Sequence, residues 1–111
     1  MNPFSDPLKV IIEMRKVTDY LLNVAHPDGS GKAKLLIRYG FHSNKPQDFV
    51  NAIVDYTQRS QIVSESETQF GKKIILEGNL ETPSNKKLMI RSIWILSQKF
   101  PILVTLSPRK Q

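Results

Sequence analysis

The sequence predicts an α+β fold, with three helices packed on one face of a four-stranded antiparallel sheet. Apolar residues recur at helical spacing up to about residue 60, and beyond it they alternate with polar residues as strands require. A length of 111 residues suits one domain with a modest core, and no repeat or linker divides the chain. We therefore expect a single domain over 1–111, with its helical part at about 10–60 and its sheet part at about 61–107.

Three helices are expected, over residues 13–23, 32–39 and 46–59. In the first, Met14, Val17 and Leu21 recur at i, i+3 and i+7, which places them on one face. The second follows a polar, glycine-rich loop and stops at Gly40, a residue type favoured just beyond helix ends. The third begins at Pro46, because proline is favoured at a first helical position.

Four strands are expected, over residues 62–68, 73–80, 87–96 and 102–106. Turns with glycine, or with proline, serine and asparagine, separate the first three and favour hairpin connections. Both faces of 87–96 are largely apolar, so we expect this strand to be central and covered on much of both faces. Residues 1–9 read as a loosely held lead-in, and the β-branched run Val10–Ile12 fits either a small strand or the start of the first helix.

Charge and composition limit the possible partners and compartments. Lys and Arg number 16 against 10 Asp and Glu, a formal net charge of +6, which suits nucleic acid, an anionic membrane or an acidic protein. No apolar run approaches the ~20 residues of a membrane span and no secretory signal is visible, so no membrane association is expected. The absence of cysteine excludes disulfides and fits a cytoplasmic location. The two histidines stand alone, so neither a metal site nor a cofactor is expected.

The loop between the first two predicted helices carries the first candidate site. It holds His26, and Lys32 follows at the start of the next helix. An imidazole can give or take a proton near neutral pH, and an ammonium beside free helix N–H groups can hold an anion. Loops between rigid elements often carry function, although a solvated turn with surface lysines has the same composition.

Polar residues inside the predicted sheet form the second candidate set. Arg91 and Ser92 interrupt the apolar strand 87–96, and a buried charge there must find a partner, reach water or serve a ligand. The structural alternative is a cross-strand pair with one of three glutamates, Glu65, Glu67 or Glu77. Trp94 is typical of a core residue and, less often, of a platform on which a base stacks. Thr105 in the last strand is either a good strand former or a hydrogen-bonding group for a ligand.

A motif begins before the loop and continues in the sheet. Residues 20–33 read Y-L-L-N-x-x-H-P-x-G-x-x-K-A, and Gly40-Phe41, Trp94-Ile95 and Leu103-Val104-Thr105 follow. This pattern resembles a small bacterial family and, more widely, the barnase–EndoU–colicin–RelE group of ribonuclease toxins. The resemblance runs from about Val10 to Pro108 and implies the fold of that group. Two places differ, since Ser92-Ile93-Trp94 replaces a frequent Thr-Val-Trp and Leu35-Leu36 replaces an aromatic pair.

The resemblance implies a metal-independent endoribonuclease, the toxin of a toxin–antitoxin pair, that needs no cofactor. Such enzymes use the RNA's own 2′-hydroxyl as nucleophile and leave a 2′,3′-cyclic phosphate. The implied catalytic residues are His26 as general acid or base, Lys32 and Arg91 as phosphate ligands, and Thr105 as a hydrogen-bonding group. The implied substrate contacts are Lys34, Lys72, Lys73, Ser92 and Trp94, with Ser92 also able to replace Thr105.

The implied partners are RNA, either tRNA or mRNA, and a small acidic antitoxin or immunity protein that covers His26 and Lys32. Three other interpretations stay open from the sequence. They are a nucleic-acid-binding module without catalysis, a protein–protein interaction domain of the antitoxin or immunity kind, and a degenerate nuclease that kept only the fold. A dependence of activity on His26 separates the nuclease from the first of these.

Overall fold

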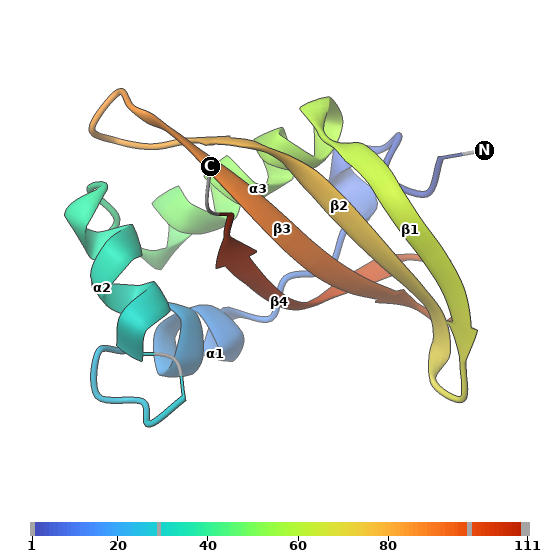
Figure 1. Cartoon of the computed structure of the whole chain (residues 1–111), viewed down its shortest axis with the longest axis horizontal. Coiled ribbons are helices and arrows are strands. Elements are labelled where there is room, and N and C mark those ends of the chain that lie inside the picture. The colour runs from blue at the N-terminus through green and yellow to red at the C-terminus, as the bar shows by residue number, and fades with distance from the viewer. Residues whose placement is uncertain (1, 29, 98, 110–111) are drawn as a thin grey trace.

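The structure, a computed structural model, describes residues 2–28, 30–97 and 99–109. It confirms the α+β fold, with the helices first and the four-stranded antiparallel sheet after them (Figure 1). The helical part consists of η1 (Pro7–Lys9), α1 (Met14–Lys16), η2 (Val17–Leu21), α2 (Ser30–Arg38) and α3 (Pro46–Arg59). The sheet consists of β1 (Gln61–Thr68), β2 (Gly71–Glu81), β3 (Lys87–Leu96) and β4 (Pro101–Pro108). Of the helices described, none is both long and apolar enough to cross a membrane.

The first predicted helix is a short α-helical turn, α1, that widens into the π-helical turn η2. The backbone N–H of Leu22 donates to the carbonyl of Val17 at 2.8 Å, a spacing of five residues that marks the wider turn. The helix ends at Leu21, earlier than expected, and the side chain of Asn23 satisfies one of its last carbonyls. In this arrangement Val17 and Leu21 are fully buried, while Tyr20 reaches toward β4.

The helices α2 and α3 agree closely with the prediction. α2 begins at Ser30, slightly before the expected start, and Gly40 follows it with a φ of +108°, a conformation that favours glycine. α3 has the predicted bounds, Pro46–Arg59. Phe49 and Ile53 on its apolar face are fully buried, and the helix packs against the sheet at β2. The helical periodicity in the sequence therefore identified both the extent and the buried face of α3.

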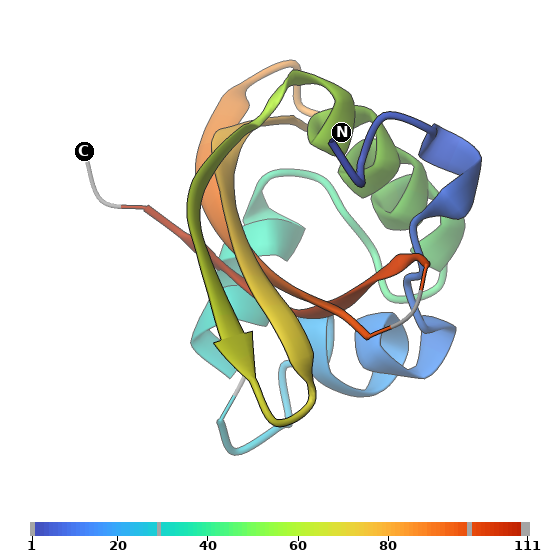
Figure 2. The ribbon, with the colours of Figure 1, turned by 90° about the vertical axis from the view of Figure 1, so that its right-hand side faces the viewer.

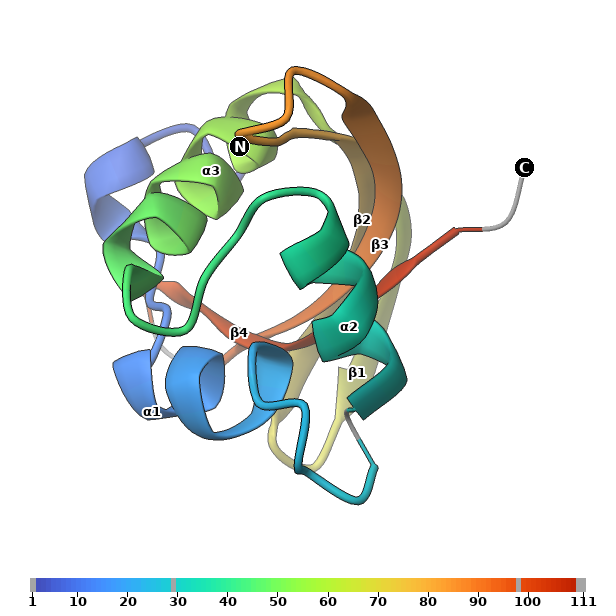
Figure 3. The same ribbon diagram turned by 90° about the vertical axis from the view of Figure 1, so that its left-hand side faces the viewer.

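The four strands form one antiparallel meander in the order β1-β2-β3-β4. The sheet curves around the helices, which all lie on its inner side (Figure 2; Figure 3). The fully buried side chains of the sheet lie on its inner face and include Ile74, Leu76, Ile90, Trp94, Leu103 and Leu106. On the outer face of β3, Met89, Ile93 and Ile95 are only half-buried. Only one face of this central strand is fully covered, contrary to the expectation that much of both would be.

The N-terminal segment is held against the sheet, so the expectation of a loose lead-in is wrong. Phe4 is 1% exposed, and its ring packs edge-on against Trp94 with centroids 5.1 Å apart. Ile11 forms a parallel bridge with Ile102, in which its N–H donates to the carbonyl of Pro101 at 2.9 Å. Of the two alternatives for Val10–Ile12, the strand-like one is therefore correct. The bridge covers part of the β4 edge, which would otherwise expose unpaired backbone groups.

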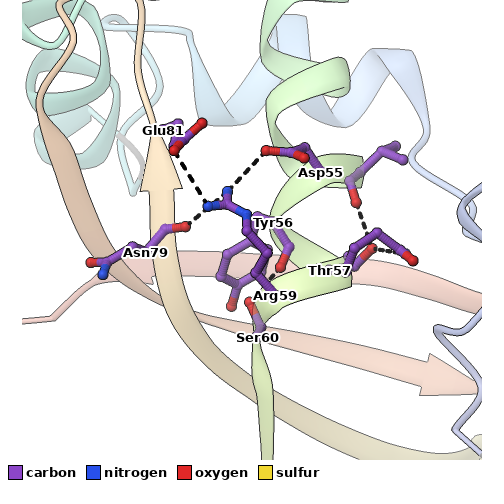
Figure 4. Close-up of polar contacts among 9 residues, drawn as sticks. Asp55, Tyr56, Thr57, Arg59, Ser60, Asn79 and Glu81 are labelled. Atoms are coloured by element: carbon purple, nitrogen blue, oxygen red, sulfur yellow. Dashed lines mark hydrogen bonds and ion pairs between the residues drawn. The ribbon is translucent and has the colours of Figure 1, made fainter.

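A polar cluster joins the end of α3 to β2 (Figure 4). The guanidinium of Arg59 contacts Asp55 at 2.9 Å, the backbone carbonyl of Asn79 at 3.3 Å and Glu81 at 3.7 Å. The charged groups of this cluster are partly exposed, so their ion pairs contribute little to the stability of the fold. Their main effect is to orient the end of α3 against β2. Glu81 is the last residue of β2, directly before the β2–β3 loop, and its carboxylate is directed at Arg59.

Candidate functional site

Three side chains from distant parts of the chain meet beside β4. The ammonium Nζ of Lys32, on the first turns of α2, donates to the hydroxyl of Tyr20 at 3.0 Å and to Oγ1 of Thr105 at 3.2 Å. The hydroxyls of Tyr20 and Thr105 are themselves 3.5 Å apart. A second ammonium lies next to this cluster, because Nζ of Lys16 donates to the carbonyl of Val104 at 2.8 Å. We call Tyr20, Lys32 and Thr105 the ammonium–phenol cluster.

His26 lies against this cluster through Tyr20. The two rings pack edge-to-face with centroids 4.9 Å apart and an angle of 76° between their planes. The backbone N–H of Asp28 donates to Nδ1 of His26 at 3.0 Å, so the neutral imidazole carries its proton on Nε2. The backbone N–H of Ser30 donates to the carbonyl of His26 at 3.1 Å, which fixes the loop to the start of α2. The structure therefore brings His26, Lys32 and Thr105 to one place.

Tyr20 is the functional candidate that the sequence reasoning missed. The residue was visible as the first position of the motif, but no feature of the sequence assigned it a role in the site. Its hydrogen bond from Lys32, followed by the one with Thr105, lowers the pKa of the Tyr20 phenol below its ordinary value. The Lys32 ammonium also lies 5.3 Å from the centre of the Tyr20 ring. The phenolate form of such a tyrosine can accept a proton, and the Lys32 ammonium supplies a positive charge beside it.

Tyr20 and Tyr56 are expected to titrate on opposite sides of the ordinary tyrosine pKa of 10.0. Lys32 lowers the pKa of Tyr20, whereas burial raises the pKa of Tyr56. Phenolate absorbance measured against pH should therefore lose its early step in Tyr20→Phe and its late step in Tyr56→Phe. Lys32→Met should move the Tyr20 step to higher pH. Two variants with the same titration curve would contradict this assignment.

The sign of the effect on stability follows from the same shift. Because the folded state lowers the pKa of Tyr20, the folded chain binds fewer protons than the unfolded chain between the two pKa values. The contribution of Tyr20 to the free energy of unfolding is therefore fully present above pH 10.0 and is lost as the pH falls through the folded pKa. Denaturant unfolding of wild type and Tyr20→Phe across this range measures it.

Arg91, the fourth expected catalytic residue, is engaged elsewhere. Nε of Arg91 donates to Glu77 on β2 at 2.6 Å, and Arg109 contacts the same carboxylate oxygen at 2.9 Å. The cross-strand pair considered from the sequence is therefore present, with Glu77 as the partner. No contact described for Arg91 reaches Lys32 or Thr105, so the structure does not place this guanidinium in the ammonium–phenol cluster.

Two of the expected substrate contacts, Ser92 and Trp94, lie in the core instead. Both are 0% exposed, on the inner face of β3. Trp94 donates from Nε1 to Oγ of Ser92 at 2.7 Å, and the hydroxyls of Ser92 and Tyr56 are 2.9 Å apart. Tyr56 in turn donates to the carbonyl of Leu76 at 3.1 Å. This closed network satisfies the buried polar groups and leaves no surface of Ser92 or Trp94 for RNA.

The three lysines expected to guide RNA do not share one surface. Lys34 is exposed on α2, close in sequence to Lys32. Lys72 lies on the inner side of β2 and approaches Glu65 at 3.4 Å, whereas Lys73 points to the opposite side. Consecutive strand residues always face opposite ways, so Lys72 and Lys73 cannot both line one RNA path. Among the described residues, no group of three His, Cys, Asp or Glu side chains is placed to hold a metal ion.

Two comparisons relate the chain to known proteins. The profile of a family described as "Domain of unknown function (DUF6883)" matches residues 4–110. A solved chain with the same fold comes from a "Contact-dependent growth inhibition toxin - immunity protein complex from Klebsiella pneumoniae 342". That chain is 21% identical with a TM-score of 0.74, and the match covers 95% of this chain and 97% of that one. At this identity the likeness shows the fold alone. No curated protein matches the sequence.

Proposed function

The chain belongs to the family described as Domain of unknown function (DUF6883) and shares its fold with a chain of a toxin–immunity protein complex, and from this premise we propose that it is a toxin-like endoribonuclease. One observation carries the proposal, namely that an ammonium, a phenol, a hydroxyl and an imidazole meet at one place. The net charge of +6 supports a polyanionic substrate. A proton acceptor beside a cation is what a 2′-hydroxyl needs in order to attack its own phosphate, which favours RNA over DNA.

In the proposed reaction the scissile phosphate lies against Lys32, whose ammonium stabilises the negative charge that develops on the phosphoryl oxygens. Tyr20 as phenolate takes the proton of the 2′-hydroxyl, and its lowered pKa makes that form more accessible. The 2′-oxygen bonds to phosphorus as the bond to the 5′-oxygen breaks, which leaves a 2′,3′-cyclic phosphate and a 5′-hydroxyl. The Nε2–H of the neutral His26 imidazole donates a hydrogen bond to the leaving 5′-oxygen, which takes its proton from water, and Thr105 orients an oxygen through its hydroxyl.

The test is cleavage of single-stranded RNA by the purified protein in EDTA. We expect 2′,3′-cyclic phosphate ends, and we expect DNA of the same sequence to stay intact. Lys32→Met should cleave about 10²–10³-fold more slowly, because the developing charge loses its cation. Lys45→Met is the matched control, since Lys45 is exposed and lies outside the ammonium–phenol cluster. A requirement for added magnesium, or equal losses in both lysine variants, would refute the proposed site. RNA binding without cleavage would instead favour a non-catalytic binding module.

We also propose a small acidic protein as the partner that restrains this activity. The positive net charge supports fast, salt-sensitive association with such a protein, and the chain with the same fold comes from a toxin–immunity protein complex. The gene of this acidic protein is expected to lie beside this chain's gene. Binding of the acidic protein should slow with rising ionic strength and should stop RNA cleavage by covering His26 and Lys32. Expression of the chain alone should arrest growth. Harmless expression of a protein that cleaves RNA in vitro would contradict the need for this partner.

A further inference from the structure

A small basic pocket lies at the end of α2 opposite to the end that carries Lys32. It has a volume of about 150 Å³ and is lined by Arg38, Tyr39, Ser84 and Lys86. Arg38 and Tyr39 come from the end of α2, and Ser84 and Lys86 come from the β2–β3 loop. The four lining residues carry a guanidinium, an ammonium, a phenol and a hydroxyl, and none of them carries a carboxylate. This is a set of hydrogen-bond donors and positive charges suited to an oxyanion.

The two walls of this pocket are fixed to each other. The backbone N–H of Ser84 donates to the carbonyl of Tyr39 at 3.2 Å. Gly40 packs so closely on Pro83 that an added Cβ would lie 3.0 Å from the proline Cβ. Within the loop, Oγ1 of Thr82 donates to the carbonyl of Lys86 at 2.5 Å and lies 3.0 Å from Oγ of Ser84. The backbone of both walls is therefore fixed before any ligand arrives, which lowers the entropy lost on binding.

The charge of this pocket is not balanced within the described part of the chain. Glu81 is the nearby acid at the end of β2, and it contacts Arg59 at 3.7 Å (Figure 4). Neither Arg38 nor Lys86 forms an ion pair with any described carboxylate. A cation at a helix C-terminus is favoured by the helix dipole, which accounts for Arg38. The dipole does not account for Lys86, which lines the same pocket as Arg38 although it carries the same charge.

The helix C-terminus does not prevent an anion from binding here. The carbonyls of Leu35, Leu36 and Ile37 accept hydrogen bonds from Tyr39, Phe41 and Gly40, at 3.1, 3.1 and 2.9 Å. The carbonyl of Tyr39 is satisfied by the backbone of the β2–β3 loop. The partial negative charge of these groups is thereby reduced, and the two full positive charges at the pocket outweigh what remains.

We propose that this pocket binds a phosphate of the RNA chain that is not the scissile one. The proposal rests on the proposed endoribonuclease function and adds the path of the substrate. Lys32 and Arg38 are six residues apart in α2, which corresponds to about 9 Å along the helix axis. Lys34 lies one helical turn before Arg38 and carries an exposed ammonium on the same side of the helix. At 3.6 residues per turn Lys32 and Arg38 point roughly 120° apart around the axis. The proposed RNA strand therefore passes around α2 from the ammonium–phenol cluster to the basic pocket, and Lys34 flanks the pocket end of this path.

The test uses two double variants that remove the same charge. Arg38→Gln/Lys86→Gln changes the pocket, and Lys45→Gln/Lys87→Gln is the matched control outside it. The probe is a single-stranded, mixed-sequence 2′-O-methyl RNA oligonucleotide, which keeps the phosphates and cannot be cleaved. We expect the pocket variant to lose about tenfold or more in affinity. Its slope of log affinity against log salt should become shallower by about 0.7, the value for one lost phosphate contact on a single strand. The control should keep the wild-type affinity and slope.

A second measurement separates this proposal from the nuclease proposal. Cleavage of a dinucleoside monophosphate involves the scissile phosphate alone, so the pocket variant should cleave it at the wild-type rate. Equal loss of affinity in the two double variants, or slower dinucleotide cleavage in the pocket variant, would overturn the phosphate pocket while leaving the nuclease intact. A wild-type protein that binds the oligonucleotide through the pocket but cleaves no RNA would overturn the nuclease and leave the pocket. Failure of wild type to bind the oligonucleotide at low salt would overturn the pocket.

Discussion

Replacing His26 by alanine is expected to slow RNA cleavage by about 10²–10³-fold, the usual cost of removing a hydrogen-bond donor from an oxygen on which charge develops in the transition state. The imidazole packs edge-on against Tyr20, and its Nδ1 accepts the N–H of Asp28, so the proposed reaction uses the Nε2–H of this ring. The side chain is only partly buried and lies in a loop, so its loss should have little effect on the core. Initial rates on a defined oligoribonucleotide measure the change.

His42→Ala is the control for this prediction. His42 is the other histidine of the chain, and it is exposed in the connection between α2 and α3. The control should cleave RNA at the wild-type rate, and both variants should unfold at the same denaturant concentration as wild type. A His26→Ala protein that cleaves as fast as wild type would show that the ammonium–phenol cluster works without the imidazole. A parallel loss in His42→Ala would point to a general effect on the fold.

Replacing Trp94 by alanine is expected to lower the free energy of unfolding by about 3–5 kcal/mol, the range for truncation of a buried aromatic side chain. The indole is 0% exposed, contacts the ring of Phe4 and donates to Ser92 at 2.7 Å. Truncation therefore leaves a cavity and removes the donor that Ser92 accepts from in a buried network. Denaturant titration followed by circular dichroism measures the loss, because the variant lacks the only tryptophan.

Phe70→Ala is the control for the core, since Phe70 is an aromatic residue that is 70% exposed. Its substitution should change the free energy of unfolding by no more than about 0.5 kcal/mol. Trp94→Phe should lie between the two, because it keeps most of the apolar volume and loses the hydrogen bond. If Trp94→Ala kept wild-type stability and weakened only RNA binding, the indole would be a stacking platform and its buried position in β3 would be incorrect.

The candidate site was predictable only in part. His26, Lys32 and Thr105 could be named from the motif, and the structure brings them together. Tyr20 could not be identified as their common neighbour, because a period of 3.6 residues does not predict a π-helical turn, and η2 contains this residue. Lys16 was missed for a similar reason, since its contact with β4 joins residues 88 positions apart. Convergence of this kind depends on how the elements pack, and local sequence does not encode it.

The sequence by itself determined the fold class, the order of the elements and the bounds of α3 and β3, because the periodicity of apolar residues is a local property. Only the tertiary structure decided which of the two faces of β3 the helices cover. The helices pack on the side of Ser92 and Trp94, so these residues are core, whereas Arg91 on the other side pairs with Glu77. Both faces of this strand are apolar enough to be buried, and the choice between them is made by α3 and the N-terminal segment, which lie far away in sequence.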